Sequence, residues 1–396
     1  MTHTDHRPWL RPMTARRADE EHRASTPLEL FFDLCFVVAV SLAAARLHHA
    51  LSTGDIDRAL PWYLLMFFGI WWAWMNFTWF ASAYDTDDGP YRITTLVQIA
   101  GVLVFAAGIP AAFDRGDLRV VVIGYVIMRL AMVTQWLRVM RADPRRRTCA
   151  ARYALGITVV QVLWILRLWV PGSWTAVSIL ILVLAELAVP IWAERAAPTT
   201  WHPHHIAERY GLFTIIVLGE SILAASTALQ EAVAAGHGDL RLHVLAGSGL
   251  VIVFALWWLY FDQPVQHMLR SLPTAIFWGY GHFVVFASVA AVGAGLQSAV
   301  DFKTHHSELS GLATGYAICV PVALYLLAVW LLIVRTDAAR RGTVAVAAYP
   351  VAAALILLAP LTPLPVEVTA LTLVTLVALT SASAPRRALP RRAVYR

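Results

Sequence analysis

Twelve apolar stretches, each long enough to cross a lipid bilayer as a helix, constrain the fold of this chain more than any other feature. A transmembrane helix needs about 20 apolar residues, because the hydrocarbon core is roughly 30 Å thick. Mean hydropathy is +0.63 and only 14% of residues are charged, against roughly 25% in soluble domains. The sequence therefore predicts an all-α, polytopic membrane helix bundle of about 12 transmembrane helices. The stretches lie at residues 28–49, 60–82, 92–113, 118–140, 150–170, 174–194, 206–230, 242–262, 274–298, 312–335, 342–359 and 364–384.

Basic residues concentrate between these stretches, in the tails and in the alternate connections that lie on one side of the predicted membrane. Most of the 31 lysine and arginine residues fall in the two tails and in the connection around residues 138–152. Such asymmetry marks cytoplasmic loops, so we expect a bacterial inner-membrane protein with both termini in the cytoplasm. The polar start of the chain lacks the apolar core of a cleavable signal peptide. The net charge of +6 reflects this topology, and we expect no nucleic-acid partner.

The two halves of the chain resemble each other weakly, which suggests a duplication of six helices. Because six is even, the halves would form parallel repeats. Chance similarity between tryptophan-rich helices is the alternative. The expected organisation is a tail at residues 1–24, six-helix halves at 25–197 and 198–384, and a basic tail at 385–396. The aligned landmarks are Glu29–Val40 with the run from Glu208, Trp71-Trp72 with Trp257-Trp258, and Tyr84-Asp85 with Phe261-Asp262.

Two carboxylates stand at the start of the first stretch, in Leu28-Glu29-Leu-Phe-Phe-Asp33. A spacing of four residues places Glu29 and Asp33 on one helix face, one turn apart. A carboxylate facing lipid is costly, so this face should point into protein or water. Thr26-Pro27-Leu28-Glu29 also fits a capping box, so Glu29 serves either as a cap or as part of a site. Asp33 lies one turn deeper, where no cap is needed.

Two further charged residues are expected inside the membrane. Glu220 follows Glu208 by 12 residues, about 18 Å along a helix, and Arg129 lies within the fourth stretch. An ion pair is the least costly way to bury an arginine. The partner of Arg129 is therefore one of Asp33, Glu220 or Glu186, and the sequence does not distinguish among them.

Histidines form the last group of candidates. His205, with Glu208 and Arg209, predicts a polar cluster at the start of the seventh stretch. Three histidines within residues 202–205 allow a zinc site, but solvation in a loop is the favoured interpretation because their spacing fits no recognised ligand pair. We expect neither metal nor cofactor. His282 is either a proton carrier or a hydrogen-bonded core histidine.

The segments Glu29-Leu-Phe-Phe-Asp33-Leu and Glu208-Arg209-Tyr-Gly-Leu-Phe-Thr-Ile-Ile-Val-Leu-Gly-Glu220-Ser resemble the two signatures of the bacterial low temperature requirement A (LtrA) family. The tryptophan pairs fit the same family. This resemblance implies a multi-pass membrane protein linked by name to growth in the cold. It implies no particular reaction.

Together these features favour a proton- or cation-coupled transporter of a small solute, in which buried acids line a path between two halves. The expected partners are membrane lipids and a solute or ion that the sequence does not identify. One alternative is a membrane-embedded enzyme acting on a lipid or isoprenoid, with the same acids as general acid and base. Another is a membrane sensor without turnover. The candidate site residues are Glu29, Asp33, Arg129, His205, Glu208, Arg209, Glu220 and His282.

Overall fold

The structure of the protein is a computed structural model, and its described residues form helices. It describes residues 9–16, 20, 24–234, 236, 239–262, 265–269, 271–337 and 342–383. Twelve helices in this part of the chain are long and apolar enough to cross a membrane, which confirms the predicted fold class. The predicted tail 385–396 and much of the tail 1–24 lie outside the described residues.

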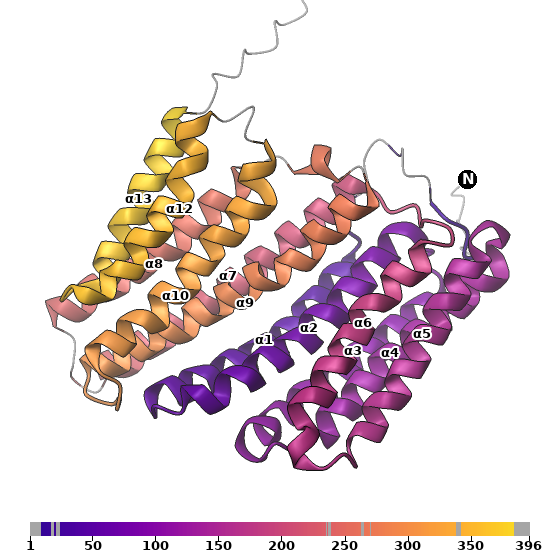
Figure 1. The fold of residues 1–396 in the computed structure, drawn as a ribbon, viewed down its shortest axis with the longest axis horizontal. Helices are drawn as coiled ribbons and strands as arrows, with labels where there is room; N and C mark the ends of the chain where they lie inside the picture. Colours follow the sequence, from indigo (N-terminus) through magenta and orange to yellow (C-terminus); the bar gives the residue numbers. More distant parts are fainter. Residues whose placement is uncertain are drawn as a thin grey trace, which may run out of the picture. The chain divides into compact units, whose positions relative to one another are not determined.

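The chain divides into two compact units, which Figure 1 colours in chain order. Unit 1 comprises residues up to Glu220 together with Gln266–Gly279, and unit 2 comprises the remainder. Two long helices, α7 and α9, run from one unit into the other. The helices that lie wholly in unit 1 are α1 (Pro27–Ser52), α2 (Ile56–Tyr84), α3 (Gly89–Arg115), α4 (Arg119–Ala142), α5 (Arg147–Arg167) and α6 (Thr175–Glu194).

Unit 2 contains the second part of α7 (Pro203–Ala234) and most of α9 (Leu272–Lys303). Its remaining helices pack in a continuous series, α8 against α13, α13 against α12, and α12 against α10, as Figure 1 shows. Their bounds are α8 (Leu240–Phe261), α10 (Gly311–Val329), α12 (Thr343–Leu358) and α13 (Pro365–Ser383).

Local chemistry explains where α1 begins. The Thr26 side chain accepts a hydrogen bond from the Glu29 backbone N–H, and the Glu29 carboxylate accepts one from the Thr26 backbone N–H. Pro27 occupies the first helical position, where its missing N–H costs nothing. The predicted capping box is therefore present, and it fixes Glu29 at the helix entrance.

Small residues let α3 and α4 approach closely. A Cβ atom added at Gly124 would lie 2.2 Å from the backbone nitrogen of Phe105, which no side chain could accommodate. Backbone contact of this kind is how helices associate in lipid, where apolar burial gives little driving force. The α3–α4 pair also packs against α2, and α3 packs against α1.

Candidate functional site

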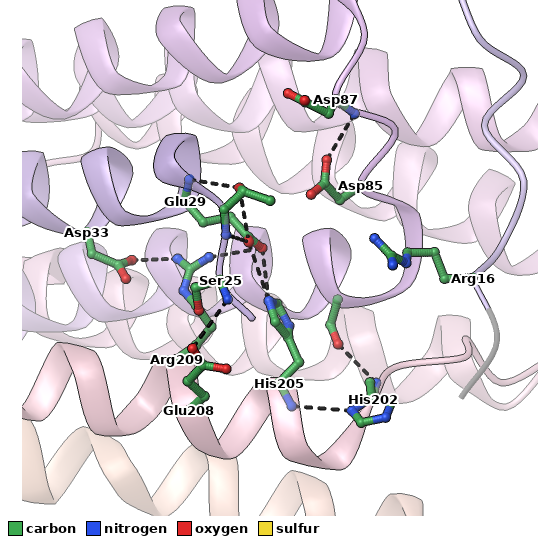
Figure 2. Close-up of polar contacts among 12 residues, drawn as sticks. Arg16, Ser25, Glu29, Asp33, Asp85, Asp87, His202, His205, Glu208 and Arg209 are labelled. Atoms are coloured by element: carbon green, nitrogen blue, oxygen red, sulfur yellow. Dashed lines mark hydrogen bonds and ion pairs between the residues drawn. The ribbon is translucent and has the colours of Figure 1, made fainter. Parts of the chain in front are cut away.

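Four ionisable side chains meet where the first turns of α1 and α7 lie side by side. Glu29 and Asp33 are four residues apart on α1, and His205 and Arg209 are four residues apart on α7. Each pair therefore occupies one helix face, and the two faces meet. We call these four residues the Glu29 cluster, shown in Figure 2.

Ion pairs connect all four members of the Glu29 cluster. Arg209 contacts both acids, with Nη1 at 3.1 Å from Glu29 Oε1 and Nη2 at 2.5 Å from Asp33 Oδ1. His205 Nε2 lies 3.2 Å from the same Glu29 oxygen. The four side chains are 0% exposed. The structure thus brings two groups that the sequence analysis treated separately, Glu29 with Asp33 and His205 with Arg209, into one cluster.

Aromatic side chains enclose the inner end of the Glu29 cluster. The Trp74 indole N–H on α2 donates a 2.6 Å hydrogen bond to Asp33 Oδ1. The same indole stacks on Phe213, with ring centroids 4.4 Å apart, and meets Tyr210 edge to face at 4.9 Å. Asp33 Oδ2 has no hydrogen-bond partner among the described residues. Asp33 therefore has apolar neighbours, and Trp74 and Arg209 both donate hydrogen bonds to its Oδ1 atom.

The outer end of the Glu29 cluster adjoins loop and tail residues. The Glu208 carboxylate accepts a 3.3 Å hydrogen bond from the Ser25 backbone N–H. His202 Nδ1 accepts a 3.4 Å bond from the His205 backbone N–H. His202 Nε2 therefore carries the proton and donates to the Glu20 carbonyl at 2.8 Å. Figure 2 shows His202, His205 and Glu208 at this outer end of the Glu29 cluster. His204 is exposed.

The N-terminal segment, residues 9–16, crosses the same end of unit 1. The Arg11 backbone N–H donates to Asp88 at 2.8 Å, and the Arg138 guanidinium binds the same carboxylate oxygen at 2.6 Å. The Trp9 ring packs where any side chain on Gly89 would stand, because an added Cβ would lie 2.6 Å from it. Asp88, at the start of α3, thus anchors the N-terminal segment to this end of unit 1.

A second buried ionic group, the Arg129 cluster, lies among α2, α4, α5 and α6. Arg129 pairs with Glu186, Nη2 to Oε2, at 3.0 Å. The same carboxylate accepts hydrogen bonds from the Trp72 indole and the Gln161 amide, each at 2.9 Å. Arg129 and Glu186 are both 0% exposed. Among the three partners left open by the sequence, the structure places Glu186 against Arg129.

The other two candidates lie apart from both clusters. Glu220 is half-buried on α7, and no hydrogen bond or ion pair of its carboxylate is found within the described residues. It follows Arg209 by 11 positions, about 16 Å along the helix. His282 is fully buried in unit 2, with Nε2 3.0 Å from the Tyr260 hydroxyl.

Three partners in these clusters were not predicted from the sequence: Trp72, Trp74 and Gln161. In the sequence analysis Trp72 served only to align the two halves of the chain. Trp74 has no sequence feature that distinguishes it from the other tryptophans of α2. Gln161 did carry a signal, because it is a lone amide in an apolar stretch and such a group needs a buried partner.

In the described part of the chain, twelve helices that are long and apolar enough to cross a membrane, together with buried ionic clusters, define a multi-pass membrane protein. The chain belongs to the bacterial low temperature requirement A (LtrA) family, whose sequence model matches residues 24–381. The resemblance noted from the two signatures is thereby confirmed. The chain is also similar to an uncharacterised protein of Rhizobium meliloti (strain 1021), with 27% identity over 319 residues that cover 76% of this chain and 74% of the relative.

Proposed function

We propose that the protein is a proton-coupled transporter of a small solute, in which the Glu29 cluster binds the coupling proton. One observation carries the proposal. Two carboxylates and one guanidinium are fully buried together with a histidine in direct contact. With His205 neutral, the formal charges of Glu29, Asp33 and Arg209 sum to one excess negative charge.

An unbalanced charge inside a membrane protein is unstable, and neutralisation is the usual response. The N-termini of α1 and α7 contribute fixed partial positive charge near the Glu29 cluster. This charge does not change with pH, so it cannot bind or release the coupling proton. His205 can titrate, because imidazole changes charge near neutral pH. One proton held between His205 and Glu29 balances the Glu29 cluster, and this argument favours a proton over a metal ion as the coupling cation.

Protonation would also alter how α1 and α7 are held together. Arg209 bridges Glu29 and Asp33 across the two helices. Adding a proton to His205 or Glu29 changes the charge facing Arg209, so it changes the strength of this bridge. A ligand shifts a conformational equilibrium only through its different affinity for the two states. The coupling proton would therefore favour one conformation of the carrier, because the ion pairs of Arg209 with Glu29 and Asp33 would differ in strength between the two conformations.

Reconstitution in liposomes that contain a pH-sensitive dye tests the proposal. A panel of amino acids, sugars, organic acids and lipophilic cations is applied to the wild type and to Asp33→Asn. The introduced amide keeps a carbonyl acceptor for Trp74 and Arg209 but leaves the cluster neutral without a proton. We expect solute-dependent internal pH change in the wild type and none in Asp33→Asn, with solute binding measured separately.

Asp117→Asn is the matched control, because Asp117 lies in the loop before α4 and pairs with the exposed Arg119. Equal proton movement in wild type and Asp33→Asn would refute the assigned role. Conversion of a lipid to a product with no solute flux would favour the enzyme alternative. Replacement of protons by sodium without loss of flux would assign the cluster to a metal cation.

A further inference from the structure

The guanidinium of Arg167, at the end of α5, is buried in unit 1 without a counter-charge. The residue is 9% exposed, and no hydrogen bond or ion pair of its side chain is found among the described residues. Its Nε atom is fully enclosed, whereas Nη1 and Nη2, which also lack partners there, are not. Arg167 therefore carries a positive charge that the described chain does not balance.

The helical spacing of α5 directs Arg167 into the protein and not toward lipid. Leu163 and Leu166, which share a different face of the helix, are 41% and 55% exposed. Arg167 instead continues a buried stripe with a spacing of three or four residues. The buried residues in the second half of α5 are Ile157, Val160, Gln161, Trp164 and Arg167. Because α5 packs against α4 and α6, this stripe faces other helices of unit 1.

The elements packed against α5 supply no acid to pair with that guanidinium. Helix α4 contains no acidic residue. The acids of α6 are Glu186, which belongs to the Arg129 cluster, and Glu194, at the opposite end of the helix. The connection 168–174 contains no acid, and Asp117, before α4, already forms an ion pair with a neighbouring arginine. A counter-charge must therefore come from outside the chain.

A second hydrogen-bond donor without an acceptor lies on the same face of α5. Trp164 is 6% exposed, and its indole Nε1 has no partner among the described residues. It precedes Arg167 by three positions, a spacing that places two Cβ atoms about 5–6 Å apart. An indole N–H and a guanidinium only donate hydrogen bonds, and buried donors normally have partners. The missing partner is therefore a hydrogen-bond acceptor.

The acceptor must also carry negative charge. A water molecule would accept these hydrogen bonds but would leave the guanidinium unbalanced. The C-terminus of α5 contributes partial negative charge, but this contribution is smaller than the cost of burying an unpaired ion. An oxyanion meets both requirements, because the planar fork of a guanidinium fits two oxygen atoms of a phosphate or carboxylate group.

We propose that Arg167 and Trp164 form a binding site for the phosphate group of a free anion or of a lipid headgroup. Four helices long enough to span a membrane separate the start of α1 from the start of α5. The end of α5 therefore lies on the opposite side of the membrane from the Glu29 cluster, where aqueous anions and lipid headgroups are both present. The site is independent of the proton-coupling proposal.

Thermal unfolding of the delipidated full-length protein in an uncharged detergent tests this proposal. Sodium phosphate is titrated at constant ionic strength, which is maintained with sodium chloride. A ligand that binds only the folded state stabilises it, so Tm of the wild type should rise by roughly 3–6 °C at ten times the Kd. Arg167→Gln should weaken binding about tenfold or more, and Trp164→Phe should weaken it severalfold.

The sign of the effect without phosphate provides a second test. Arg167→Gln removes a buried charge that has no partner, so this variant should unfold at a higher temperature than the wild type in phosphate-free buffer. Saturating phosphate should reduce or reverse the difference. Arg115→Gln is the matched control, because Arg115 also lies in the last turn of its helix, α3, but is exposed. It should respond to phosphate as the wild type does.

A second titration, with dihexanoylphosphatidylglycerol, distinguishes the two sources of the phosphate group. A lower Kd for this short-chain phospholipid than for inorganic phosphate would support the site and assign it to a lipid headgroup. An equal or lower Kd for inorganic phosphate would support it as a site for a free anion. If both compounds stabilise the wild type, Arg167→Gln and Trp164→Phe equally, they act through the solvent or at another place, and the proposal is overturned.

Discussion

The two ionic clusters of unit 1 are equally buried, yet they differ in charge balance. In the Arg129 cluster one guanidinium meets one carboxylate, and neutral donors from Trp72 and Gln161 complete the hydrogen bonding of Glu186. In the Glu29 cluster two carboxylates share one guanidinium, and a histidine contacts one of them. A balanced group has no reason to take up a proton near neutral pH. An unbalanced group that includes imidazole does.

The charge balance of a buried cluster distinguishes structural from functional ionisable residues better than the burial of its side chains does. Both clusters join helices through buried ion pairs, and both satisfy the rule that buried charges are paired. The default view of intramembrane charges as functional would assign them the same role. Charge balance is the property on which we propose proton binding for the Glu29 cluster and a structural role for the Arg129 cluster.

The largest expected effect is on stability, from Glu186→Gln. This substitution leaves Arg129 buried without a counter-charge, and breaking such a pair costs about 3–5 kcal/mol. Thermal unfolding in detergent should show a large drop in melting temperature. The double variant Arg129→Met with Glu186→Gln removes both charges and keeps an acceptor for Trp72 and Gln161. It should recover most of the loss; if it is as unstable as the single variant, the charge argument is wrong.

Changing the charge balance should exchange the proton behaviour of the two clusters. Arg129→Gln leaves Glu186 unpaired, so this cluster should gain one bound proton near pH 7. Asp33→Asn balances the Glu29 cluster, which should lose one. Infrared difference spectroscopy, which detects the carbonyl stretch of a protonated carboxyl group, and potentiometric titration of the purified protein can check both. If the number of bound protons changes in neither variant, charge balance does not determine which of the two clusters binds a proton.

A matched pair of tryptophan variants should sharpen the comparison further. Trp72→Phe and Trp74→Phe each remove one indole N–H that donates to a buried carboxylate, Glu186 or Asp33. A hydrogen bond to a charged group is worth about 1.5–3 kcal/mol. We expect both variants to lose stability by that amount, but only Trp74→Phe should change the pH dependence of proton uptake. An equal change in both would indicate that the two clusters titrate alike.

Sequence patterns predicted the helices and named the four residues of the Glu29 cluster as candidates in two local groups, but they did not predict that the two groups meet. The span at 60–82 proved to be Ile56–Tyr84, longer because a hydropathy window stops at Asp57 and Arg58 while the helix continues through them. Glu29 and Asp33 were predicted to share a face because four-residue spacing is a local property. Which acid meets Arg129 depends on how α4 and α6 pack, and no local pattern encodes that. The hydrogen bond from Trp74 to Asp33 was not predicted either, because it depends on how α1 and α2 pack.

The smallest expected effect concerns Asp88, a carboxylate outside both clusters that anchors the N-terminal segment. Burial alone would raise the pKa of Asp88. Hydrogen bonds from the Arg11 and Tyr91 backbone N–H groups and from Arg138 outweigh burial and hold the pKa below its ordinary value of 3.8. Because the folded pKa is lowered, this contribution to stability is fully present above the unfolded pKa and is lost as the pH falls through the folded pKa.

Asp88→Ala should therefore loosen the N-terminal segment at neutral pH by about 1 kcal/mol, the usual cost of a lost helix cap. Hydrogen exchange at the Arg11 and Tyr91 amides, measured at pH 7, should rise severalfold, while exchange in α4 near Arg129 stays unchanged. Asp117→Asn, which removes an exposed pair with Arg119, should leave Arg11 and Tyr91 protected. If Asp88→Ala instead alters proton uptake by the Glu29 cluster, the N-terminal segment controls access to that cluster.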